Sequence, residues 1–206
     1  MRQHLMTRPV IKNEYYIRFG EIYRVNSNSK KNLRTDILKP LIDSLELMLA
    51  KYCRVHILRF DLHLTEFTSD NRIMSTLQRR LFKRIRAKYK IRNIGFVWVR
   101  EKERATAQHY HCAIYLNGNK IRHPGLIQHW IKEIWSQLEG SSNHWAGYHN
   151  INRGDWAAIQ NAIYHISYLA KTRGKGYRPT QTKDYGWARN ICATVSTEKN
   201  LGNQNN

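Results

Sequence analysis

Two neighbouring apolar segments near the middle of the chain constrain its fold more than any other feature. Residues 94–101 are rich in β-branched and aromatic side chains, residues 109–116 form a second apolar run, and the polar residues 102–108 lie between them. Segments of this composition that are separated by a short polar turn are typical of paired antiparallel strands. We therefore expect a β-hairpin here, within an antiparallel sheet.

The rest of the chain shows mainly helical periodicity. Apolar side chains recur at intervals of three and four in four segments, which predicts helices over residues 35–52, 71–90, 124–138 and 156–172. Thr35 or Asp36 is a candidate cap for the first helix, and Asp155 for the last. A mixture of antiparallel strands and separate helices predicts an α+β fold.

One further long strand and one edge strand complete the predicted sheet. Residues 54–65 carry apolar side chains typical of a buried strand, with Asp61, His63 and Thr65 together on the opposite face. Asp61 and His63 are therefore candidates for a site, although a polar face on a half-buried strand is the commoner explanation for such residues. Residues 147–152 are a candidate edge strand.

A candidate metal site lies on the second strand of the predicted hairpin. His109 and His111 are two residues apart, so both imidazoles lie on one face of the strand and can reach one ion. The chain has 10 histidines, so this pair alone is weak evidence. Glu101, at the end of the paired strand, supplies a carboxylate; Glu103 and Asp61 are alternative third ligands. Two imidazoles and one carboxylate leave open positions on a divalent ion for phosphate oxygens.

A second candidate site lies on the last predicted helix. Tyr164, Tyr168 and Lys171 share one face, roughly 120° away from the apolar stripe that Ile159 and Ile163 help to form. The pKa of a phenol is about 10, so a nucleophilic tyrosine needs a lysine or a metal ion that favours the phenolate. Surface tyrosines that merely cover the sheet are the alternative interpretation.

The charge of the chain indicates a polyanionic partner. The formal net charge is +20, and the isoelectric point is about 10.2. Residues 79–92 hold eight Lys and Arg residues and no acidic residue, although a basic helical face is often only solvated. Since cations that bind nucleic acid release its counterions, phosphate contact is a reasonable prediction. The candidates are Arg79, Arg80, Lys83, Arg84, Lys171, Arg173 and Lys175.

Several other classes of protein are not expected. The sequence has no apolar segment of about 18 residues and no signal-peptide core, so we expect a cytoplasmic protein without a membrane partner. It has no Walker-type nucleotide-binding motif, so neither a fused helicase nor a small-molecule cofactor is expected. Its three cysteines lack Cys-x-x-Cys spacing, which argues against a zinc finger or a disulfide framework.

Three of these segments resemble the motifs of the HUH endonucleases. His109-Tyr110-His111 is similar to their His-hydrophobe-His motif, residues 59–64 resemble the preceding strand motif, and residues 164–171 resemble the tyrosine motif. The order of the elements most resembles the rolling-circle replication initiators of filamentous phages and related prophage proteins. The resemblance covers about residues 54–175 and implies a split βαββαβ, RRM-like sheet with flanking helices.

The resemblance also implies a mechanism. His109 and His111 would bind Mg²⁺ or Mn²⁺, and Tyr168 would attack a phosphodiester and stay joined to its 5′ phosphate, releasing a 3′ hydroxyl that primes synthesis. Tyr164 matches the second tyrosine of two-tyrosine initiators, and Lys171 would contact the scissile phosphate or tune the phenol. We therefore expect a bacterial, DNA-associated nickase that acts on single-stranded DNA at a phage or prophage replication origin, with the helicase and polymerase supplied by the host.

This interpretation divides the chain into three parts, and other functions remain as alternatives. Residues 1–33 would be an N-terminal extension, 34–175 the endonuclease domain, and 176–206 a basic extension with a disordered tail. A transposase or a mobilisation relaxase would use the same chemistry, and a non-catalytic DNA-binding regulator could share the scaffold. RNA binding through an RRM-like sheet would need exposed aromatic side chains on the central strands, for which Phe96 and Trp98 are candidates. It would leave the histidines and Glu101 unexplained.

Overall fold

A five-stranded antiparallel sheet lies at the centre of the protein. The computed structural model describes residues 9–28, 30–102, 107–138, 140–176 and 179–188. Within them the sheet has the strand order β8-β5-β7-β6-β9. The strands are β5 (Arg54–Leu64), β6 (Gly95–Glu101), β7 (His109–Asn117), β8 (Gly140–Asn152) and β9 (Tyr185–Trp187). The predicted α+β class and the predicted hairpin are confirmed, since β6 pairs with β7 in an antiparallel register.

The path of the chain through this sheet is a βαββαβ unit. Helix α2 (Arg72–Tyr89) connects β5 to β6, and helix α3 (Gly125–Ser136) connects β7 to β8. The first and third strands of the unit, β5 and β7, lie side by side in its middle, with β8 and β6 outside them. This is the split, ferredoxin-like arrangement that was expected.

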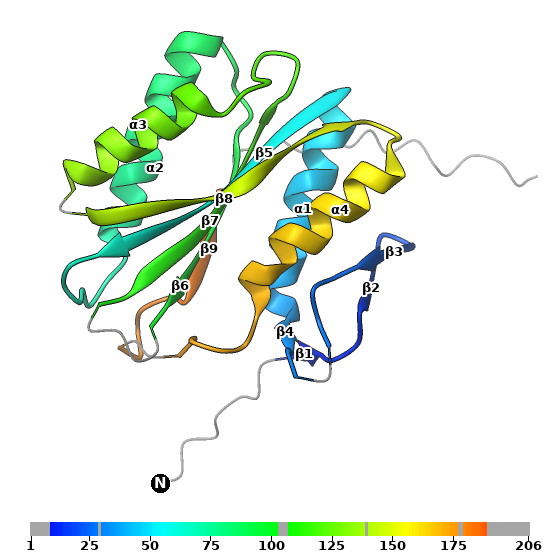
Figure 1. The fold of residues 1–206 in the computed structure, drawn as a ribbon, viewed down its shortest axis with the longest axis horizontal. Helices are drawn as coiled ribbons and strands as arrows, with labels where there is room; N and C mark the ends of the chain where they lie inside the picture. The colour runs from blue at the N-terminus through cyan, green and yellow to red at the C-terminus, as the bar shows by residue number, and fades with distance from the viewer. Residues whose placement is uncertain (1–8, 29, 103–106, 139, 177–178, 189–206) are drawn as a thin grey trace, which may run out of the picture.

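Helices cover both faces of the sheet, as Figure 1 shows. Helices α2 and α3 pack on one face, and α1 (Thr35–Lys51) and α4 (Trp156–Ser167) pack on the other. Residues of β7 alternate between the two cores: Cys112 and Ile114 belong to the α2–α3 core, and Ala113 and Tyr115 to the α1–α4 core. Because side chains alternate along a strand, the two histidines of β7 lie on the α1–α4 side.

The two predicted helix caps have different outcomes. Asp155 caps α4 as expected, because its Oδ1 accepts a hydrogen bond of 3.0 Å from the Ala158 amide. The cap predicted for α1 is wrong: its N-cap residue is Arg34, without a side-chain cap. The candidate side chains have other partners, since the Thr35 hydroxyl donates to the Pro9 carbonyl and the Asp36 carboxylate accepts from Arg34.

The last helix is shorter than predicted. Helix α4 ends at Ser167 and continues as a single 3₁₀ turn, η1 (Tyr168–Ala170). After this turn the chain becomes extended at Lys171, which pairs with Leu33, and the Thr172 amide donates to the Asn32 carbonyl. This pairing with a segment far away in the sequence ends the helix, and it places Tyr168 on the tight turn.

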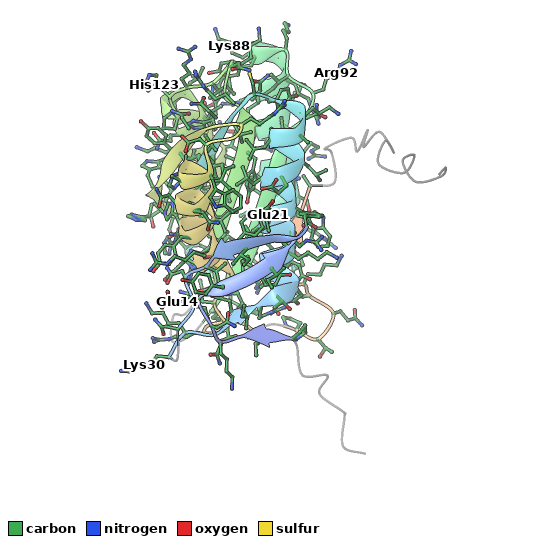
Figure 2. The ribbon with its side chains drawn as sticks, turned by 90° about the vertical axis from the view of Figure 1, so that its right-hand side faces the viewer. Glu14, Glu21, Lys30, Lys88, Arg92 and His123 are labelled. Atoms are coloured by element: carbon green, nitrogen blue, oxygen red, sulfur yellow. The ribbon has the colours of Figure 1, made fainter. Side chains whose placement is uncertain are left out.

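The N-terminal segment forms a layer outside α1 and α4. Strands β2 (Tyr15–Arg18) and β3 (Glu21–Arg24) form a hairpin. It lies beyond the α1–α4 layer in Figure 1 and crosses in front of α1 in Figure 2, where Glu14 and Glu21 are labelled. Two short strands, β1 (Val10–Ile11) and β4 (Leu33–Arg34), pair beside it.

Neither predicted domain boundary coincides with an edge of this folded unit. Tyr23, Val25 and Leu33, from the predicted N-terminal extension, belong to the α1–α4 core. From the predicted C-terminal extension, β9 adds a fifth strand to the sheet by pairing with β6. Asp184, just before β9, forms a buried ion pair of 2.7 Å with Arg34. The predicted disordered tail lies outside the described residues.

Among the described residues, no helix has the length and apolar character that crossing a membrane requires.

Candidate metal and tyrosine site

Glu101, His109 and His111 meet on the α1–α4 face of the sheet. Glu101 of β6 lies directly opposite His109 of β7 in the strand register. The Nε2 atoms of the two histidines are 3.2 Å apart, and Glu101 Oε2 lies 3.1 Å from His111 Nε2 and 3.7 Å from His109 Nε2. The three side chains, which we call the Glu-His-His cluster, form a largely buried group that can hold a metal ion.

The donor spacing of the cluster fits a small divalent cation. Oxygen and nitrogen ligands at about 2.1 Å from an octahedral ion lie roughly 3 Å from one another at adjacent positions. The donor separations in the cluster are 3.1, 3.2 and 3.7 Å. Three ligands on one side of an ion leave its remaining positions open to a substrate. The chemistry of the residues therefore suits a metal that acts on an oxygen-rich ligand.

The alternative third ligands are resolved in part. Asp61 lies opposite His111 in the β5–β7 register, and its Oδ1 accepts a hydrogen bond of 2.6 Å from His111 Nδ1. It therefore contacts the far side of the ring and leaves Nε2 facing the cluster. A carboxylate in this position fixes the orientation of a ligating histidine. Glu103 lies outside the described residues, so the geometry selects Glu101 over Asp61.

Lysines surround the carboxylate of the cluster. Lys175 Nζ lies 2.6 Å from Glu101 Oε1, and Lys171 Nζ lies 3.2 Å from Oε2. Burial alone would raise the pKa of Glu101, but the neighbouring His109 and His111 side chains and the charge of Lys175 hold it well below the usual range. Glu101 is therefore an anion, with one oxygen on Lys175 and the other facing the histidines.

Tyr168 lies against this cluster. Lys171 Nζ donates a hydrogen bond of 2.7 Å to the Tyr168 hydroxyl. The Tyr168 ring meets the His111 ring edge to face at 5.7 Å between centroids, and the Arg59 guanidinium lies 4.5 Å from the Tyr168 ring centroid. The η1 turn thus brings the phenol to the candidate metal site, where Lys171 contacts the Tyr168 hydroxyl and the Glu101 carboxylate at once.

Lys171 carries a positive charge in this position. Burial lowers the pKa of its ammonium group, but the hydrogen bond to Tyr168 and the negative charge of Glu101 outweigh burial and raise the pKa above its ordinary value. A charged ammonium donates hydrogen bonds more strongly than a neutral amine, and it stabilises an anion that develops on the oxygen it contacts.

Tyr164 has different surroundings. Its side chain is 39% exposed, and the guanidinium of Arg24, from the N-terminal hairpin, lies 5.1 Å from its ring centroid. Tyr168, one turn further on, contacts His111 and Lys171. The predicted shared face of the two tyrosines therefore does not give them a shared environment.

The predicted phosphate contacts are scattered. Arg79, Arg80 and Lys83 are exposed on α2, which covers the face of the sheet opposite to Tyr168. Arg84 forms two hydrogen bonds, of 2.6 and 2.9 Å, with the Glu133 carboxylate of α3. The structure therefore does not bring these side chains together with the tyrosine.

The two basic residues after η1 also differ from each other. Arg173 is exposed, close in sequence to Lys171. The side chain of Lys175 is only 2% exposed and contacts Glu101, so the prediction that it lies on a DNA-binding surface is corrected. Burial lowers its pKa to about 8, although the Glu101 carboxylate opposes this shift. Lys175 positions the carboxylate of the cluster.

The RNA-binding alternative is contradicted at its two candidate residues. Phe96 is 0% exposed and Trp98 is 8% exposed, because α2 and α3 cover that face of the sheet. An RRM-like surface needs aromatic side chains on which bases can stack. These two rings are part of the α2–α3 core.

Sequence reasoning missed the roles of Arg59 and Lys175. Arg59 shares a face of β5 with Asp61, as the period of two along a strand requires. The sequence shows this shared face, but only the pairing of β5 with β7 shows that the face belongs to the site. Lys175 carried no local signal, because the turn at η1 determines where it lies.

Comparison with known proteins shows the family to which the chain is similar. Residues 21–187 match the sequence profile of the family described as the YagK/YfjJ C-terminal domain. Neither a curated protein nor a solved structure matches the chain. The matched range includes β3, all the residues of the site and β9.

Proposed function

This chain belongs to the YagK/YfjJ C-terminal domain family, and we propose that it is a metal-dependent endonuclease that cuts single-stranded DNA with a tyrosine nucleophile. One observation carries the proposal. Lys171 Nζ is 2.7 Å from the Tyr168 hydroxyl and 3.2 Å from the carboxylate of the Glu-His-His cluster. A phenol, a cation that stabilises its anion and a candidate metal site therefore meet at one point.

The reaction would exchange one phosphoester bond for another. The Tyr168 oxygen attacks the phosphorus, a bond forms between them, and the bond from phosphorus to the 3′ oxygen breaks. The phenol loses its proton and the departing 3′ oxygen gains one, so the products are a 5′-phosphotyrosine and a free 3′ hydroxyl. The charged Lys171 favours the phenolate and so activates the nucleophile. Since no phosphoester is hydrolysed, the reverse reaction can rejoin a strand.

A divalent cation, Mg²⁺ or Mn²⁺, held by Glu101, His109 and His111 would polarise the phosphate and offset its developing negative charge. The chain's own residues prepare this site. Asp61 orients His111, and Lys175 holds the second oxygen of Glu101. Arg59 lies over the Tyr168 ring and donates toward the His165 carbonyl at 3.5 Å, which restricts the position of the phenol.

We further propose that the nickase initiates rolling-circle replication of a phage or prophage element in the bacterial cytoplasm, with host helicase and polymerase. The resemblance of three segments to the motifs of HUH replication initiators supports this assignment. The βαββαβ sheet is compatible with it, because the central strand β7 presents the two histidines and the turn η1, which follows α4, presents Tyr168.

A covalent-capture assay tests the proposal over many candidate nicking sequences at once. The chain is incubated with a pool of random single-stranded oligonucleotides and Mn²⁺, and protein joined to DNA is separated on a denaturing gel and sequenced. We expect an adduct that requires the metal and is lost in Tyr168→Phe and His109→Ala. Binding without any adduct, over the whole pool and with both Mg²⁺ and Mn²⁺, would instead indicate a non-catalytic DNA-binding regulator.

A further inference from the structure

Tyr164 contacts the N-terminal hairpin and lies one turn before the proposed nucleophile, Tyr168. The guanidinium of Arg24 lies 5.1 Å from the centroid of its ring, and the ring is 39% exposed. Tyr164, on α4, precedes Tyr168, the first residue of η1, by about one turn, a rise of about 6 Å. A strand that reaches Tyr168 along α4 would therefore pass an exposed aromatic ring that is already paired with a cation.

Hydrogen bonds fix the hairpin to α4 on both sides of this ring. On the N-terminal side, Gln160 Oε1 accepts from the Arg24 amide at 2.7 Å, and Gln160 Nε2 donates to the Ile22 carbonyl at 2.8 Å. On the C-terminal side, the Ser167 hydroxyl accepts from the Asn26 amide and donates to the Tyr164 carbonyl, both at 2.8 Å. The backbone around Arg24 and Tyr164 is thus preorganised.

The Arg24 guanidinium remains accessible to a ligand. Its charged partner is Glu14, at 3.6 Å, and the two side chains are 60% and 51% exposed. An ion pair this exposed contributes little stability, so a phosphate or a base can replace it at small cost. Exposed aromatic rings beside an arginine, on a strongly basic protein, are the features that hold single-stranded nucleic acid without sequence preference.

We propose that Tyr164 and Arg24 form a nucleobase-stacking platform for single-stranded DNA beside the scissile phosphate, and that Tyr164 is a binding residue and not a second nucleophile. This inference rests on the proposed function and deepens it. The ammonium that stabilises a phenolate contacts Tyr168, whose ring also lies against His111. Tyr164 instead faces Arg24, so its aromatic ring contributes more to the binding of DNA than its hydroxyl group does.

Binding is measured in a Tyr168→Phe background, so that no strand is cut. Fluorescence anisotropy with a labelled oligonucleotide, at one fixed salt concentration, gives the dissociation constants. Since stacking on an aromatic ring contributes about 1–3 kcal/mol per base, Tyr164→Ala should weaken binding roughly 5- to 150-fold. Tyr164→Phe, which keeps the ring, should bind like its parent. Arg24→Gln should weaken binding as well.

Tyr148 supplies a matched control. It is also an exposed tyrosine, at 46%, and its ring stacks on His56, but it lies opposite Leu58, on the α2–α3 face of the sheet. Tyr148→Ala should leave the affinity unchanged. Circular dichroism spectra of all variants should match that of the parent. If Tyr164→Ala does not fold like the parent, Tyr164→Leu replaces it, because leucine removes the aromatic ring but keeps an apolar side chain.

The outcomes separate this inference from the proposed function. Unchanged affinity in Tyr164→Ala would overturn the platform. A Tyr164→Phe variant of the chain with Tyr168 intact would also overturn the platform if it nicked DNA but no longer rejoined the strands. The Tyr164 hydroxyl would then be the group that acts, and Tyr168 would remain the first nucleophile. If the native chain forms no covalent adduct but its affinity depends on the Tyr164 ring, the nickase fails and the platform stands.

Discussion

At the scale of single residues, the site depends on side chains that hold other side chains in place. Asp61 accepts from His111 Nδ1 at 2.6 Å, and hydrogen bonds from His111 keep the pKa of Asp61 low although burial opposes this. The negative charge also makes the imidazole a better donor of electrons to a metal ion. Asp61 should therefore affect metal binding without being a ligand.

Asp61→Asn tests this role. The amide oxygen of Asn can still accept from His111 Nδ1, but the negative charge is lost, so the affinity for Mn²⁺ should fall about 10- to 100-fold. Isothermal titration calorimetry measures the affinity directly. Asp43→Asn, on α1, is the control, since Asp43 pairs with Arg18 of the hairpin. Equal affinity in Asp61→Asn and the native chain would contradict the orienting role.

How much of the site is visible in the sequence depends on how local its contacts are. Glu101, His109 and His111 belong to one hairpin, so the alternation along two strands was sufficient to bring them together. Asp61 reaches His111 only through the β5–β7 register, which connects residues 50 positions apart. That register depends on packing over the whole sheet, and a local pattern cannot supply it.

At the scale of elements, the end of α4 determines where the tyrosine lies. The apolar spacing of the sequence continues through Leu169 and Ala170, both buried. Because a 3₁₀ turn buries residues at nearly the same spacing as an α-helix, periodicity could not locate the change at Ser167. The pairing of Lys171 with Leu33 causes it, and this contact is invisible to a local pattern.

The start of α4 gives a simple stability prediction. Asp155 Oδ1 accepts from the Ala158 amide, which otherwise lacks a partner in the first turn. Asp155→Ala should lower the free energy of unfolding by about 0.5–2 kcal/mol, whereas Asp155→Ser should lower it by less, because serine is also a good cap. Urea denaturation measures both. Equal losses in the two variants would show that the charge, and not the cap, is what matters.

The contact between α4 and β8 should make stability depend on pH. His165 Nδ1 lies 2.9 Å from His149 Nε2. Burial lowers the pKa of His165 to about 4, with smaller contributions from Arg59 and His149. Between pH 6.5 and 4 the unfolded chain therefore binds a proton at His165 that the folded chain does not bind. The free energy of unfolding should fall as the pH falls through this range.

His165→Gln isolates this contribution from the other titrating groups. Glutamine can still form a hydrogen bond with His149 but does not titrate, so the variant should lose less stability on acidification than the native chain. The expected difference is on the order of 1–2 kcal/mol between pH 6.5 and 4, after allowance for partial solvent screening. Urea denaturation at several pH values measures it. Parallel stability curves for the two proteins would exclude His165 as the group responsible.

At the scale of the whole molecule, the prediction agrees with the structure better for the long central elements than for the short elements near the ends of the chain. Long, strongly periodic segments became β5, β6, β7 and the four helices. Strand β9 has only three residues, too few to show a period, and it completes the sheet because a buried ion pair between Asp184 and Arg34 holds its start. Short elements depend on such long-range contacts.

The layered architecture also separates two basic regions. Arg79, Arg80 and Lys83 lie on α2, while Lys171 lies on the far side of the sheet. Helices and sheets pack about 10 Å apart, so the α2 cations lie beyond the Debye length of about 8 Å at physiological ionic strength. They should therefore act on DNA only where the strand itself passes over α2.

Replacing Arg79, Arg80 and Lys83 by Gln should therefore have an effect that depends on the length of the DNA. An oligonucleotide that covers only the tyrosine site should bind with unchanged affinity at physiological salt. A strand long enough to reach around the domain should bind more weakly, and the slope of log K against log salt should become less steep by up to about 2, since each phosphate contact with a single strand contributes about 0.7. Anisotropy titrations at several salt concentrations measure both.

Arg84→Gln is the control: Arg84 is already paired with Glu133, so its loss should change the slope least. If the short oligonucleotide also lost affinity in the triple variant, the DNA would have to pass over α2 close to Tyr168, and the sheet would not separate the two regions.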